Sequence, residues 1–141
     1  MAMDKPKVLF LCTQNSCRSQ MAEGFLRHLA GDKFEAASAG AHPSRVNPDA
    51  IKVMSEIDID ISGQHSKDVS QFWGQRISYA ITVCDKARER CPIFPGSLWN
   101  LHWPIDDPAS AQGPNDERLA LFRRVRDEIG RRVQEFVAKE A

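Results

Sequence analysis

The sequence lacks a surplus of charge, because 19 lysine and arginine residues stand against 19 aspartate and glutamate residues in 141. Affinity for a nucleic-acid backbone needs a cationic surplus or cluster, so nucleic acid is not the expected partner. Long apolar runs are missing too. The longest, over residues 8–12, is far short of the ~20 residues that span a bilayer, and the N-terminus has no signal-peptide core. We therefore expect a cytoplasmic protein without membrane contact.

Internal repeats, low-complexity stretches and flexible linkers are absent as well, which predicts one domain over residues 1–141. A chain near 150 residues buries roughly 68–70% of the surface that its unfolded form exposes, so its size requires no metal or disulfide for stability. The four cysteines therefore need another explanation. In a reducing compartment they indicate buried thiols, a metal site or redox chemistry.

Apolar patterns predict alternating strands and helices. Strands are expected over residues 7–12, 34–38, 78–83 and 98–103, and helices over residues 21–29, 48–57 and 122–137. Asn47 followed by Pro48 is a typical helix start. This order predicts the α/β class, with a mainly parallel sheet and helices on both faces.

Ligands of such sheets bind at the carboxyl ends of the strands, and chemically reactive residues occur at those ends. Cys12 ends the first strand, Cys84 follows the strand over residues 78–83, and Asp106 and Asp107 follow the last strand. We therefore expect residues that are ~70–95 positions apart in sequence to share one edge of the sheet.

The loop after the first strand leads directly into a helix. Its residues are Cys12, Thr13, Gln14, Asn15, Ser16, Cys17, Arg18 and Ser19. Backbone N–H groups of such a loop, together with the helix N-terminus, form a cradle for a tetrahedral oxyanion. The loop has neither the Walker nor the dinucleotide glycine pattern.

The side chains of this loop predict a nucleophile. Arg18 supplies a bidentate fork for two oxygens of the anion and favours the thiolate of Cys12. A cysteine thiolate at a helix N-terminus beside a cation is a nucleophile at neutral pH. We expect Ser19 to donate a hydrogen bond to this thiolate and Asn15 to brace the loop from inside.

Cys84 and Cys91 form a Cys-x6-Cys pair separated by polar residues. In a helix, positions seven apart lie ~10.5 Å apart along the axis, beyond the ~7 Å limit for the Cα atoms of a disulfide. A disulfide between them therefore requires this turn to unwind. Two unrelated core thiols are one alternative. A zinc site shared with Cys12 and Cys17 is disfavoured, because zinc ligand pairs usually keep two to four intervening residues.

At this point the chain resembles a known family. Its Cys-x5-Arg loop resembles that of the low-molecular-weight protein tyrosine phosphatase fold, and residues 12–24 closely resemble the arsenate reductases built on that fold. The resemblance continues through Ser38-Ala39-Gly40, Asn47-Pro48, Ile59-Asp60-Ile61-Ser62, Val83-Cys84, Cys91-Pro92, His102-Trp103, Asp106-Asp107-Pro108-Ala109 and residues 122–129. It implies a four-stranded parallel sheet flanked by helices, with the Cys12 loop as the anion site.

Resemblance to the thioredoxin-coupled arsenate reductases also implies a reaction. Cys12 attacks arsenate, Arg18 neutralises charge, and Asp107 acts as the general acid that protonates the departing hydroxide. Cys84 then attacks Cys12, which releases arsenite and leaves a Cys12–Cys84 disulfide. Cys91 moves the disulfide to Cys84–Cys91, where thioredoxin reduces it.

The same resemblance implies a monomer that binds no cofactor and no metal, with thioredoxin as electron donor. Phosphate and sulfate are the expected competing anions. Cys17 has no step in this scheme, and we expect it to pack inside the loop.

Three other functions compete with this one. A low-molecular-weight phosphatase would use the same nucleophile, arginine and acid, but its relatives carry aromatic residues after the Asp-Pro pair, where Ala109 and Ser110 stand here. Such a phosphatase also has no need of Cys84 and Cys91. The second alternative is an arsenate reductase served by glutathione and glutaredoxin, and the third is a sensor that binds the oxyanion without turnover.

Two positions depart from the family pattern. Gln14 stands where relatives often have glycine, so a positive φ at that position would strain the loop. Some relatives hold a potassium ion beside the loop. Asn15, Glu23 and Ser38 match its ligands, but Lys67 stands where the aspartate ligand would fall. We expect the Lys67 ammonium to replace the ion and the activity to be indifferent to potassium.

Overall fold

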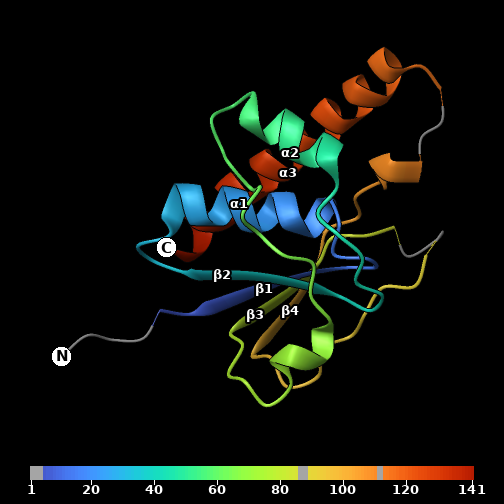
Figure 1. Ribbon diagram of the computed structural model, residues 1–141. Coiled ribbons are helices and arrows are strands. Elements are labelled where there is room, and N and C mark those ends of the chain that lie inside the picture. The colour runs from blue at the N-terminus through green and yellow to red at the C-terminus, as the bar shows by residue number, and fades with distance from the viewer. Residues whose placement is uncertain (1–4, 86–88, 111–112) are drawn as a thin grey trace.

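The computed structural model describes residues 5–85, 89–110 and 113–141 (Figure 1). Its sheet has four parallel strands in the order β2-β1-β3-β4. The strands are β1 (Lys7–Cys12), β2 (Glu35–Gly40), β3 (Tyr79–Thr82) and β4 (Trp99–His102). The α-helices are α1 (Arg18–Ala30), α2 (Pro48–Ser55) and α3 (Asn115–Glu140), and the short 3₁₀ helices are η1 (Val69–Phe72) and η2 (Pro108–Ser110). These elements confirm the predicted four-stranded parallel sheet flanked by helices.

Strand β1 lies inside the sheet and is covered on both faces, which explains its unbroken apolar run. Successive side chains of a strand point to opposite faces. Val8 and Phe10 belong to the core on the helix side, whereas Leu9 and Leu11 belong to the core on the other side. Strands buried on both faces are apolar at nearly every position, so the run over residues 8–12 is a local consequence of topology.

The two faces of the sheet are covered differently (Figure 1). Helices α1, α2 and α3 lie on one side, and the opposite side carries η1 and loop segments. The sequence led us to expect helices on both faces. The α-helices lie on one face only, and the helix on the other face is the short 3₁₀ helix η1. Small side chains such as Ala37 and Ala80 keep the second layer thin, so Phe72 and Phe94 suffice to cover it.

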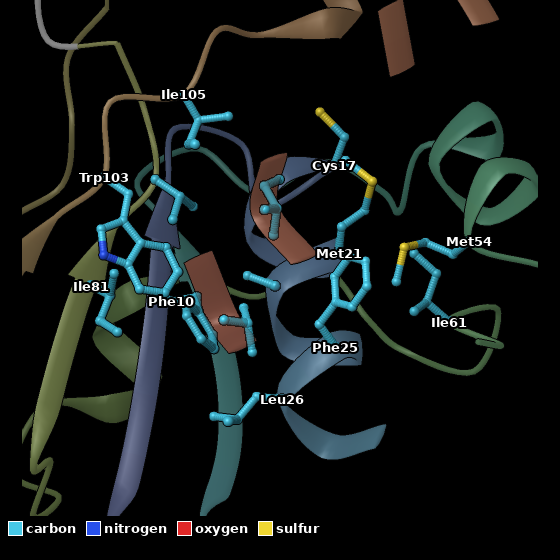
Figure 2. Packing of buried hydrophobic residues seen from close by; sticks show 14 of the residues in the cluster. Phe10, Cys17, Met21, Phe25, Leu26, Met54, Ile61, Ile81, Trp103 and Ile105 are labelled. Carbon is cyan, nitrogen blue, oxygen red and sulfur yellow. The ribbon is translucent and has the colours of Figure 1, made fainter. Parts of the chain in front are cut away.

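Helix α1 carries the candidate loop at its N-terminus and is held firmly from the side. Figure 2 shows Met21 and Phe25 of α1 beside Met54 and Ile61. Gly24 permits this approach, because a Cβ at that position would lie 2.6 Å from Cγ2 of Ile61. Among the described residues, no helix is both long enough and apolar enough to cross a membrane.

Helix α2 begins as the sequence predicts and is tied to the loop. The Oδ1 atom of Asn47 accepts hydrogen bonds from the N–H groups of Asp49, at 2.8 Å, and Ala50, at 3.4 Å. Such an N-cap contributes about 1 kcal/mol to helix stability. The backbone N–H of Asn47 also donates to the carbonyl of Ser16 at 2.9 Å. The α2 terminus therefore buttresses the loop after β1.

Strand register brings the predicted reactive positions to one edge. Cys12 lies opposite Gly40, and Thr82 lies between Leu11 and His102 on its two neighbouring strands. The segments that carry Cys84 and Asp107 therefore leave the sheet beside the Cys12 loop, as expected for parallel strands.

Gly40 is the point where the end of β2 approaches this loop most closely. A Cβ at position 40 would lie 2.7 Å from the nitrogen of Asn15 and from the carbonyl oxygen of Thr13, and 2.8 Å from the carbonyl oxygen of Cys12. All three are backbone atoms, which cannot move aside as the end of a flexible side chain can. Only glycine therefore fits here.

We expect Gly40→Ala to lower the free energy of unfolding by about 1–3 kcal/mol, the usual cost of overpacking, and to slow alkylation of Cys12 by iodoacetamide. Urea unfolding followed by tryptophan fluorescence and mass-resolved alkylation measure the two effects. Gly63→Ala is the matched control, because no atom lies within 4 Å of a Cβ at that position. Equal stability and equal alkylation in the two variants would contradict the role of Gly40.

Candidate active site

A cleft of about 470 Å³ opens at the carboxyl edge of the sheet. The loop after β1, the segment after β3, the segment before η2 and the first half of α3 form its walls. Six of the predicted loop residues line it: Cys12, Thr13, Gln14, Ser16, Cys17 and Arg18. Asn15 and Ser19 are fully buried behind this lining, where they support the loop.

Asn15 fixes the conformation of the loop. Its φ of 49° lies in the left-handed region, which asparagine tolerates better than most residues. Its Oδ1 accepts from the N–H of Lys67 at 2.8 Å and from Nε2 of Gln20 at 3.0 Å, and its Nδ2 donates to Oγ of Ser19 at 2.8 Å. Since a backbone N–H can only donate, the Lys67 contact determines which end of the amide is the oxygen.

Gln14 does not have the positive φ that would strain its backbone. In the described part of the chain, the non-glycine residues with positive φ are Asn15 and Asp58, so the left-handed position of the loop is one residue beyond Gln14. The Gln14 carbonyl is held by Oγ of Ser66 at 2.9 Å and by the N–H of Ser44 at 3.3 Å. The cradle therefore needs no glycine at position 14.

Cys12 lies next to Ser19 and close to the start of helix α1. Its Sγ lies 2.8 Å from Oγ of Ser19, which confirms the expected contact. Because Ser19 already accepts a hydrogen bond from Asn15, its own proton is available to donate to sulfur. Helix α1 starts at Arg18, so its unpaired N–H groups add positive partial charge near the same sulfur.

Arg18 holds a carboxylate that the sequence did not lead us to expect. Its Nη1 and Nη2 donate to Oε2 and Oε1 of Glu89 at 2.6 and 2.7 Å, and Nη1 also donates to the carbonyl of Ile105 at 3.1 Å. Burial lowers the pKa of the Arg18 guanidinium, but the bonds to Glu89 outweigh it and hold this pKa above its ordinary value. The guanidinium therefore stays charged although it is only 3% exposed.

Asp107 lines the cleft close to Arg18. Its Oδ2 is 3.8 Å from Nη2 of Arg18, and its Oδ1 accepts from the N–H of Ala109 at 3.0 Å. Asp106 also lines the cleft but is exposed. Cys17 donates to Oδ1 of Asp107 at 3.6 Å. Burial raises the pKa of the Cys17 thiol, and negative charge at Cys12 and Asp107 raises it further, so Cys17 is a protonated packing residue.

Cys84 and Cys91 are joined in a disulfide with a Cα–Cα distance of 6.3 Å, whereas Cys12 is a free thiol. The N–H of Val83 donates to the carbonyl of Leu11 at 2.8 Å, which starts this segment beside the end of β1. Among its described residues, which exclude 86–88, the segment has no helix. The expected unwinding of this turn concerns residues 86–88, which lie outside the described residues.

The Lys67 ammonium lies near Glu23, one of the residues that match the potassium ligands of relatives. Its Nζ is 3.8 Å from Oε1 of Glu23, a buried carboxylate that also accepts from Ser38 and Arg27. Burial lowers the pKa of Lys67, while the charge of Glu23 acts in the opposite direction. The backbone of Lys67 contacts Asn15 directly, so this cluster supports the loop from behind.

Comparison with known proteins matches this fold and site to one family. The family model for low molecular weight phosphotyrosine protein phosphatase matches residues 7–140, and the chain belongs to that family. Its sequence relatives include proteins named arsenate reductase from Halalkalibacterium halodurans and Bacillus subtilis. They are 48% and 45% identical over 134 residues, which are 95% of this chain and 96% of each relative.

Solved structures lead to the same group. An arsenate reductase in the phosphate binding state superposes with a TM-score of 0.80 at 35% identity, covering 96% of this chain and 99% of that chain. A thioredoxin-dependent arsenate reductase from Corynebacterium glutamicum superposes with a TM-score of 0.74 at 28% identity, covering 99% of this chain and 63% of that chain.

We expect Ser19→Ala to slow alkylation of Cys12 by iodoacetamide at pH 7 about tenfold, because a hydrogen bond to a charged group contributes roughly 1.5–3 kcal/mol. Mass-resolved alkylation separates Cys12 from Cys17. Ser66→Ala is the control, since Ser66 also bonds the loop, at the Gln14 carbonyl rather than at sulfur. An unchanged Cys12 rate in Ser19→Ala would exclude the hydroxyl as its activator.

Proposed function

We propose that this protein reduces arsenate to arsenite, with Cys12 as nucleophile and with Cys84 and Cys91 as a relay that thioredoxin regenerates. The observation that carries the proposal is the Cys84–Cys91 disulfide beside an anion loop that holds a free Cys12 thiol. A hydrolytic phosphatase of the same fold needs neither relay cysteine. The relatives named arsenate reductase support the same substrate.

In the first step the Cys12 thiolate attacks arsenic in an arsenate held by the loop N–H groups and Arg18. A sulfur–arsenic bond forms and an arsenic–oxygen bond breaks. Asp107, which lines the cleft 3.8 Å from Arg18, protonates the departing hydroxide so that it leaves as water. Arg18 balances the charge on the remaining oxygens.

The electrons come from sulfur in the second step. The Cys84 thiolate attacks Sγ of Cys12, the sulfur–arsenic bond breaks, and its electron pair stays on arsenic, which leaves as arsenite. A Cys12–Cys84 disulfide remains. The Cys91 thiolate then attacks Sγ of Cys84 and releases the Cys12 thiolate, and the dithiol of thioredoxin reduces the resulting Cys84–Cys91 disulfide.

The accessibility of the sulfurs supports this order. Cys12 and Cys84 are buried, whereas Cys91 is partly exposed. Thiol–disulfide exchange with another protein requires access to a sulfur atom, so the partner is expected to attack at Cys91. Such a cycle fits the cytoplasm, where thioredoxin keeps thiols reduced. Phosphate, which has the same tetrahedral shape, is expected to compete for the loop.

Arsenate-dependent NADPH oxidation with thioredoxin and thioredoxin reductase tests the relay. We expect Cys12→Ser, Cys84→Ser and Cys91→Ser each to abolish steady-state turnover, because each removes one sulfur of the relay. Cys17→Ser is the matched control and should turn over at nearly the wild-type rate, since Cys17 has no step in the relay and a serine hydroxyl can also donate to Asp107.

Full turnover of Cys91→Ser with thioredoxin would contradict the relay. Turnover with glutathione and glutaredoxin alone would identify the other electron donor. Hydrolysis of an aryl phosphate at an arsenate-like rate by Cys84→Ser would favour the phosphatase.

We expect Asp107→Asn to slow arsenite formation in a single turnover about 10²- to 10⁴-fold, the usual contribution of a general acid, while phosphate still binds. Rapid-quench measurement of arsenite gives the rate, and calorimetry gives phosphate affinity. Asp106→Asn removes the same charge from the exposed rim of the cleft and should leave the rate within about twofold, far below one general-acid effect. Equal rates in both variants would assign the proton to another group.

A further inference from the structure

The Glu89 side chain lines the cleft and binds two residues of the anion loop, Arg18 and Thr13. Its two carboxylate oxygens accept from Nη1 and Nη2 of Arg18 at 2.6 and 2.7 Å, and Oε1 also accepts from the hydroxyl of Thr13 at 2.6 Å. The side chain is attached to the segment between the two disulfide cysteines, 71 positions from Arg18 in the sequence. No step of the proposed reaction uses it.

The Glu89 contact has the geometry of an oxyanion contact. An arginine fork binds two oxygens of a carboxylate in the same way as two oxygens of a phosphate or an arsenate. Arg18 is nevertheless not saturated, because its buried Nε has no hydrogen-bond partner among the described residues. A buried N–H without a partner is costly, so a ligand with more oxygens would satisfy this arginine better than Glu89 does.

Glu89 is ionised at neutral pH and competes as an anion. Burial raises the pKa of its carboxyl group, but the hydrogen bonds from Arg18 and Thr13 outweigh burial and hold this pKa below the ordinary value. Glu89 takes both Nη atoms of the fork, so an oxyanion can bind them in the same bidentate way only after Glu89 has left. Glu89 and an oxyanion are therefore mutually exclusive on Arg18.

The disulfide is what holds Glu89 in place. Cys91 follows Glu89 by two positions, and its bond to Cys84 fixes the Cα–Cα distance at 6.3 Å. Asp85 adds two backbone contacts, accepting from the N–H of Glu89 at 3.0 Å and donating its own N–H to Oε2 at 3.2 Å. Reduction removes this covalent constraint, and a regular helix would place the two cysteines ~10.5 Å apart along its axis.

We propose that Glu89 is an internal substitute for the oxyanion, seated on Arg18 only while the Cys84–Cys91 disulfide is closed. The inference rests on the proposed role of the Cys12 loop as the arsenate site. The oxidised enzyme then excludes arsenate until thioredoxin has reduced it, so substrate cannot occupy a form that has no thiol ready to reduce it. Tethering makes this competition effective, because an intramolecular group competes at millimolar or higher effective concentration.

Oxyanion binding and the redox state of the disulfide must affect each other reciprocally. If the disulfide weakens oxyanion binding by some factor, the oxyanion must favour reduction of the disulfide by the same factor. Phosphate should therefore shift the Cys84–Cys91 couple towards the dithiol. A tenfold difference in affinity corresponds to about 30 mV for this two-electron couple.

The test measures phosphate affinity by calorimetry for the reduced and the oxidised protein, with the Cys84–Cys91 pairing of the oxidised form verified by mass mapping. Phosphate is the probe because the thiols cannot reduce it. We expect oxidised wild type to bind phosphate at least tenfold more weakly than reduced wild type. Glu89→Gln and Glu89→Ala should remove most of that difference. Asp106→Asn is the charge control and should keep it.

The outcomes separate the two proposals. Equal phosphate affinity of reduced and oxidised wild type, or a difference that survives in both Glu89 variants, overturns the role of Glu89 and leaves the reductase intact. Failure of the reduced wild type to bind phosphate overturns the anion loop and the Glu89 substitute together. Loss of the difference in Asp106→Asn as well would show a general charge effect and would also overturn the role of Glu89.

Discussion

The site depends on one buried amide. Asn15 is held in a left-handed conformation and uses its side chain to join the loop, the start of α1 and the backbone of Lys67. A left-handed asparagine is costly unless its surroundings determine it, and these bonds do so. The same amide orients Ser19 towards Cys12, so loop shape and nucleophile activation have a common origin. The adjacent Gly40 leaves room for that backbone.

Arg18 links the Cys12 loop to the segment between Cys84 and Cys91. It is buried, charged and close to three acceptors: Glu89, the Ile105 carbonyl and Asp107. A buried cation is stable only when its charge is compensated, which favours an anion in its fork. In the form with the Cys84–Cys91 disulfide that anion comes from the chain itself, and the proposed reaction replaces it with arsenate. On this proposal, the redox state of Cys84 and Cys91 bears directly on the first step of the reaction.

The sequence predicts the framework and the local chemistry well, because both depend on short-range patterns. The apolar run of β1, the Asn47 cap and the arrangement of Cys12, Ser19 and Arg18 within eight positions need only local geometry. Glu89 was missed because its contact with Arg18 depends on the path that a disulfide imposes, which no periodicity encodes. The left-handed residue was considered at Gln14 although it lies at Asn15, since a glycine in relatives marks a loop but not the φ of each residue. The 3₁₀ helix η1 was also not predicted, because it is too short to show a helical period.

Cys17 shows how the loop distinguishes between two chemically identical groups. It lies in the same eight-residue loop as Cys12, and simple proximity would make the two sulfurs natural partners for oxidation. Its raised pKa keeps a proton on sulfur, and a protonated thiol does not attack a disulfide or a sulfur–arsenic bond. The bound proton therefore keeps Cys17 from acting as a nucleophile. In the proposed relay, this proton leaves the attack on Cys12 to Cys84, which lies outside the loop, and disfavours a Cys12–Cys17 disulfide.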